Sequence, residues 1–162
     1  MVYIYTNKIL RHFTMGDYRK RPKGRYLKEA DWADLYHLCK NWRSGLAFYK
    51  DDLRFLHHLI DKYFIWMIKK DNVDEVRKIE KNLLEVDKKC EDLLQKTNKH
   101  MVHIESLVEN PKSMESRIFR MEHEHLEDEI SDFIELFRIN KKEIFGISEH
   151  FVDIKKLQYL KT

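Results

Sequence analysis

Apolar residues recur at steps of three and four along most of this chain, the spacing that places side chains on one face of a helix. The first such row predicts a long helix over about residues 31–69. Its members are Leu35, Leu38, Trp42, Leu46, Tyr49, Leu53, Leu56, Ile60, Tyr63 and Met67. Because the row continues along the whole helix, the helix needs partners along its whole length to bury it.

Two further rows predict long helices over about residues 72–108 and 113–145. The second row is Val76, Ile79, Leu83, Val86, Cys90, Leu93, Thr97, His100, Ile104 and Leu107. The third row is Phe119, His123, Leu126, Ile130, Phe133, Phe137, Asn140 and Ile144. A buried polar group needs a partner, so the histidines in these rows are the first candidates for a role beyond packing.

Residues that start or stop helices separate the three rows. Asn72 can cap the second helix, and Glu75 stands three residues later, where its side chain can complete a capping box. Pro111 cannot continue a helix, and Ser113 can cap the third one. These signals agree with the periodicity and predict the same boundaries.

Composition supports an all-α fold for residues 30–162. The chain of 162 residues has only four Gly and two Pro, far fewer than turn-rich folds need. Short connections make successive helices antiparallel neighbours. We therefore predict an elongated antiparallel bundle, or coiled coil, of three long helices. A short C-terminal helix is expected after Gly146, capped by Ser148.

The basic charge of the chain is concentrated near its N-terminus. Residues 1–29 carry a net charge of +6, which leaves −3 for residues 30–162 because the whole chain carries +3. Residues 1–29 also lack a sustained helical period, so we expect a disordered tail. Basic residues interleaved with Tyr and Phe can bind nucleic acid or an anionic surface, and such binding is one interpretation of the tail.

Neither a membrane span nor a disulfide is expected. The longest apolar run, residues 63–68, is far shorter than the roughly 20 residues that cross a bilayer, and no secretory leader is visible. We therefore expect a cytoplasmic protein. Cys39 and Cys90 form no Cys-x-x-Cys motif and fall at different levels of the predicted bundle, so both are expected to be core residues.

The two histidines in the buried rows are expected to meet. Residues equally distant from a helix–helix turn lie side by side, which places His100 level with about residue 122 and therefore close to His123. Glu122, His125 and His103 lie within about two turns of that level. This set could hold a zinc or iron ion, although a single Glu-x-x-His motif does not make a di-iron site. The alternative is a buried polar layer that sets the register of the helices.

A second row on the first helix suggests a protein interface. It consists of Phe48, Phe55, Leu59 and Trp66. Since no phosphate-binding loop, dinucleotide fingerprint or nucleophile elbow is present, no catalytic residue can be assigned. The leading interpretation is a non-enzymatic structural or protein-interaction module, with a homodimer or a protein partner held by this row. No cofactor other than the zinc or iron ion is expected.

The stretch WRSGLAFYKDDL, from Trp42 to Leu53, resembles the first helix of a group of small uncharacterised bacterial helical-bundle proteins. Their pattern is roughly Trp-x-x-x-Leu-x-Phe-(Phe/Tyr)-Lys-Asp-(Asp/Glu)-(Leu/Ile). The chain departs from it at Gly45, where an acidic residue is commoner. The resemblance implies a long helix and no particular activity.

Overall fold

The structure, a computed structural model, describes residues 25–68, 73–108 and 114–159. Side chains are described for residues 25–62, 73–108 and 114–149. Four helices make up almost all of this part of the chain. They are α2 (Tyr26–Glu29), α3 (Trp32–Ile68), α4 (Val73–Leu107) and α5 (Met114–Tyr159). The described residues contain no strand, which confirms the all-α prediction.

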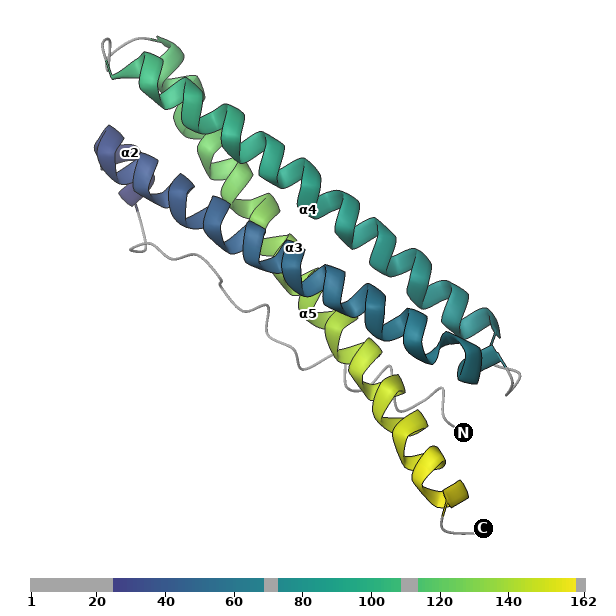
Figure 1. Ribbon diagram of the computed structural model, residues 1–162. Coiled ribbons are helices and arrows are strands. Elements are labelled where there is room, and N and C mark those ends of the chain that lie inside the picture. The colour runs from purple at the N-terminus through teal and green to yellow at the C-terminus, as the bar shows by residue number, and fades with distance from the viewer. Residues whose placement is uncertain (1–24, 69–72, 109–113, 160–162) are drawn as a thin grey trace.

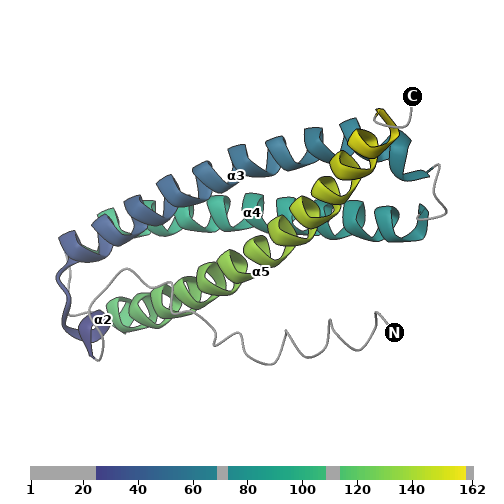
Figure 2. The ribbon, with the colours of Figure 1, turned by 90° about the horizontal axis from the view of Figure 1, so that it is seen from below.

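The three long helices differ in how they lie against one another. Helices α3 and α4 run side by side over most of their length, whereas α5 crosses them obliquely (Figures 1 and 2). At 1.5 Å per residue, the 46 residues of α5 span about 69 Å, and its last turns project beyond the other two helices (Figure 1). Since α5 diverges from α3 over part of its course, a groove of about 550 Å³ lies between these two helices.

The prediction of a separate short C-terminal helix is wrong, because α5 continues through Gly146 to Tyr159 as one helix. Ser148 does not cap a new helix; its Oγ donates a hydrogen bond to the carbonyl oxygen of Ile144, one turn earlier (2.8 Å). A single glycine costs a helix only about 1 kcal/mol. The buried row, which includes Ile144 and Ser148, continues across the glycine and stabilises the uninterrupted helix.

A short helix, α2, lies inside the region expected to be a tail. The side chain of Leu27 is buried, and the Arg120 guanidinium on α5 donates a hydrogen bond to the Leu27 carbonyl oxygen (Nη1–O, 2.7 Å). The same guanidinium lies 4.7 Å from the centre of the Trp32 ring. The folded part of the chain therefore includes residues 25–29, whereas the rest of the expected tail, residues 1–24, lies outside the described residues.

The three predicted rows form the core. Every member of the second and third rows is buried, and so are the described members of the first row except Tyr49, which is half-buried. Thr97 and Asn140 donate side-chain hydrogen bonds within their own helices. Their acceptors are the carbonyl oxygens of Leu93 (2.8 Å) and Leu136 (2.9 Å). The histidines of these rows turn toward each other, with Nε2 of His100 3.0 Å from Nδ1 of His123.

The helix start at Trp32 has a clear cause, since the Asp31 carboxylate accepts a hydrogen bond from the backbone N–H of Asp34 (2.7 Å). The predicted caps Asn72 and Ser113 lie outside the described residues. Among the described residues, none of the helices combines the length and the apolar character that a membrane span requires.

Candidate metal centre

Three buried side chains, one from each long helix, meet near one end of the bundle. Cys39 lies on α3, His100 on α4 and His123 on α5. The Nε2 atom of His100 lies 3.0 Å from Nδ1 of His123, a hydrogen bond between the two rings. The Cys39 sulfur lies 3.8 Å from the same His123 Nδ1. All three potential ligand atoms lie within 4.8 Å of one another.

Aromatic rings hold the two imidazoles in place. The His100 ring stacks on Phe119 with 3.9 Å between ring centres and an interplanar angle of 11°. Trp42 lies 4.6 Å from the His123 ring, and Trp32 packs edge-on against Phe119 at 5.6 Å. These contacts restrict the rotation of both imidazoles, so the donor atoms are oriented before any ligand arrives.

Burial keeps the Cys39 thiol and the His100 imidazole uncharged at neutral pH in the absence of a metal. Cys39 and His123 are fully buried, and His100 is 8% exposed. Desolvation raises the pKa of the Cys39 thiol to about 12. Desolvation, followed by the nearby His103, lowers the pKa of His100 to about 4. At neutral pH the His100 ring is therefore a neutral imidazole, the form that binds metals.

One thiol and two imidazoles are donors that zinc prefers. Zinc–nitrogen bonds of about 2.0–2.1 Å and zinc–sulfur bonds of about 2.3 Å place two nitrogens about 3.3 Å apart in a tetrahedral site, and sulfur and nitrogen about 3.6 Å apart. The observed separations of 3.0 and 3.8 Å are within a few tenths of an ångström of these values. Within the described residues, Cys39, His100 and His123 are the one group of three such side chains that meets this distance criterion.

The predicted carboxylate and outer histidine ligands do not join this triad. His103 pairs with Glu115 (Nε2–Oε1, 3.1 Å), and His125 pairs with Glu129 (Nε2–Oε1, 3.3 Å). The side chain of Glu122 is exposed. A surface groove of about 430 Å³ lies between α4 and α5, and its lining includes His100, His103, Glu122, His125 and Glu129. The structure thus brings all five predicted residues to one region. His100 and His123 belong to the buried triad, whereas His103, Glu122 and His125 line the groove beside it.

Cys39 is a ligand candidate that was expected from the sequence only as a core residue. Its burial is confirmed, and both Cys39 and Cys90 are free thiols. The pattern alone did not show that the Cys39 sulfur lies next to His123.

The proposed interface row is partly accessible. Phe48 and Phe55 are 65% and 56% exposed, which is high for aromatic side chains. Leu59 is half-buried against the core, and the side chain of Trp66 lies outside the described residues. Phe48 also lines the groove between α3 and α5, so the row and this groove share one residue.

Comparisons with known proteins give no match: no family model, no curated protein and no solved structure is significantly similar to this chain. The resemblance of residues 42–53 to small bacterial helical proteins therefore stays a prediction.

Proposed function

We propose that this protein is a metal-binding helical bundle whose ligands are Cys39, His100 and His123, with zinc as the preferred ion. One observation carries the proposal: three helices each place one nitrogen or sulfur donor in a shared, buried position. Because the donor set contains a thiol and no carboxylate, hard ions such as magnesium and calcium fit poorly.

Binding would exchange protons for the metal ion. The Cys39 thiol would lose its proton to water, and the ion would replace the hydrogen bond between His100 and His123. The high pKa of the thiol makes metal binding depend on pH, since the proton must be displaced at neutral pH. A structural zinc site has four ligands, so the fourth would be water or a bound molecule.

Elemental analysis of untagged protein tests this proposal directly. We expect about one zinc per chain in the wild type and a loss of most of it in Cys39→Ala. Cys90→Ala is the matched control, because Cys90 is also a fully buried thiol but bonds the Leu46 carbonyl oxygen instead (3.4 Å). Cobalt substitution should add a thiolate-to-cobalt absorption band in the wild type and in Cys90→Ala. Equal metal content in both variants, or none in the wild type, contradicts the proposal.

Without a metal, we propose that the same layer sets the register of an antiparallel coiled coil. The hydrogen bond between the two imidazoles satisfies one polar group on each of α4 and α5 only when the helices are correctly aligned. This proposal does not compete with metal binding, because the same alignment also assembles the metal ligands.

A second candidate function, supported by the exposure of Phe48 and Phe55, is protein interaction through α3, with a second copy of the chain as the partner. Light scattering is then expected to give twice the chain mass for the wild type. The Phe48→Asp, Phe55→Lys double variant should halve that mass, whereas Leu84→Asp on α4, which also changes an exposed apolar residue, should not. A monomeric wild type would rule this function out.

Nucleic-acid binding by the basic N-terminal segment is a third proposal, and its residues 1–24 lie outside the described part of the chain. Deleting these residues should abolish salt-dependent retention on DNA.

A further inference from the structure

A buried metal site needs a route by which the ion arrives, and one ligand of the triad marks such a route. Cys39 and His123 have no exposed surface, whereas His100 is 8% exposed. His100 is also the member of the triad that lines the groove between α4 and α5. An ion that approaches from solvent through this groove therefore meets His100 first.

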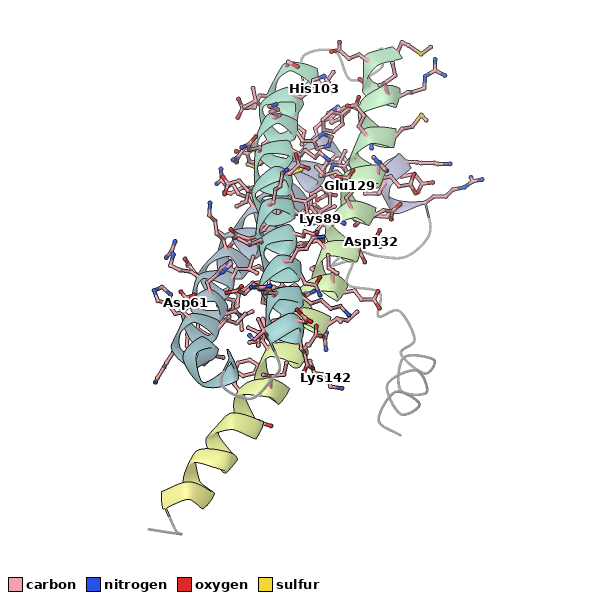
Figure 3. All side chains as sticks on the ribbon, turned by 90° about the vertical axis from the view of Figure 1, so that its right-hand side faces the viewer. Asp61, Lys89, His103, Glu129, Asp132 and Lys142 are labelled. Atoms are coloured by element: carbon pink, nitrogen blue, oxygen red, sulfur yellow. The ribbon has the colours of Figure 1, made fainter. Side chains whose placement is uncertain are left out.

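The walls of this groove carry groups that bind metal ions. Glu122, Glu129 and His125 come from α5 and His103 from α4 (Figure 3 labels Glu129 and His103). His125 is 77% exposed and lies 3.3 Å from the Glu129 carboxylate, whose residue is itself only 27% exposed. The pair thus joins an exposed imidazole to a half-buried carboxylate in the lining of the groove.

A lysine competes for the same carboxylate. The Lys96 ammonium lies 2.9 Å from Glu129 and 3.0 Å from Asp92, and these hydrogen bonds raise its pKa. A divalent ion can bind Glu129 only if it displaces the Lys96 ammonium group or shares the carboxylate with it. Lys96 therefore hinders the binding of a divalent ion to Glu129, whereas the free Glu129 carboxylate and the His125 imidazole favour it.

We propose that metal ions enter and leave the Cys39–His100–His123 centre through the α4/α5 groove, with Glu129 and His125 as transient ligands and Lys96 as their competitor. This inference rests on the proposed metal-binding function and makes the centre an exchangeable site for a zinc-like divalent ion. Transient ligands lower the barrier in both directions, so they change association and dissociation rates by the same factor and leave the equilibrium unchanged.

Stopped-flow mixing of the full-length metal-free protein with cobalt ions tests the route, with the thiolate-to-cobalt absorption band as the readout. Glu129→Gln and His125→Ala should each slow both association and chelator-driven dissociation by about threefold or more, with Kd unchanged. Lys96→Met should accelerate both rates, because it frees the Glu129 carboxylate.

Glu124→Gln is the matched control for Glu129→Gln. It removes the same charge from an exposed position on α5 that does not line the groove, so its rates should equal those of the wild type. Wild-type rates in both Glu129→Gln and His125→Ala, or slower rates in Lys96→Met, would overturn the route while metal binding itself remains. Absence of a cobalt–thiolate band in the wild type would overturn both proposals.

Discussion

At the scale of single residues, the protonation of His100 links the buried layer to stability. The folded state holds this imidazole neutral, with a pKa of about 4, whereas the ordinary value for histidine is 6.5. The unfolded chain therefore binds a proton between these two pH values that the folded chain does not. Stability contributed by His100 is complete above pH 6.5 and is lost as the pH falls toward 4.

We accordingly expect the metal-free protein to unfold more readily as the pH is lowered from 6.5 to 4. The shift in pKa corresponds to about 3 kcal/mol over that range. Urea titrations at several pH values, in the presence of a chelator, measure this change. His100→Gln should flatten the pH dependence because glutamine does not titrate; a slope of the same size in this variant would assign the effect to other groups.

Fluorescence of Trp42 offers a second readout at this scale, because its ring lies 4.6 Å from the His123 imidazole. We expect zinc to change the emission of the wild type at one equivalent and to leave that of Cys39→Ala unchanged. Trp42 is one of several tryptophans, so Trp32→Phe should keep the zinc-dependent change. A change that persists in Cys39→Ala would place the ion elsewhere.

At the scale of helices, a substitution at Gly146 can distinguish a continuous α5 from two helices joined by a turn. A Cβ added at Gly146 would meet no atom within 4 Å, so alanine fits the position. In a helix interior, alanine is better than glycine by about 0.5–1 kcal/mol. A glycine that ends a helix would instead have a left-handed backbone conformation, which alanine disfavours.

Gly146→Ala should therefore stabilise the protein by about 0.5–1 kcal/mol in chemical denaturation. Gly45→Ala provides a control for a glycine in the middle of α3, where the added Cβ also meets nothing within 4 Å, and should have a similar effect. If Gly146→Ala destabilised the protein while Gly45→Ala stabilised it, α5 would end near residue 146.

The helices themselves were largely predictable, and the reasons differ from place to place. Steps of three and four identify a buried row whatever it packs against, so three long helices were predicted, although the third was expected to end near residue 145. Gly146 and Ser148 were misjudged because both residues commonly occur at helix ends. The helix passes through both residues, and the burial of Ile144 and Ser148 explains why.

At the scale of the whole molecule, α2 closes the end of the bundle that contains the histidine layer. Leu27 is buried, and Arg120 joins α2 to α5 through the Leu27 carbonyl oxygen (2.7 Å). Arg120 also covers Trp32, which contacts Phe119, the ring on which His100 stacks. The N-terminal part of the folded chain is therefore in contact with the supports of the proposed metal centre.

Removal of residues 1–30 should destabilise the protein by several kcal/mol more than removal of residues 1–24, since only the longer deletion removes Leu27 and Ala30 from the core. Leu27→Ala alone should cost about 2–3 kcal/mol, within the range for buried leucines. Thermal or urea unfolding measures both effects. Equal stability of the two truncated proteins would show that α2 contributes nothing to the fold.

The sequence by itself determined the all-α class, the buried rows and the meeting of His100 with His123, because periodicity and the distance from a turn depend only on the regular geometry of helices. It did not determine the oblique course of α5, the docking of α2 or the presence of Cys39 in the histidine layer. Those features depend on which side of each helix faces which neighbour. Only the tertiary structure decides that, because the packing of bulky side chains sets helix rotation and crossing angle.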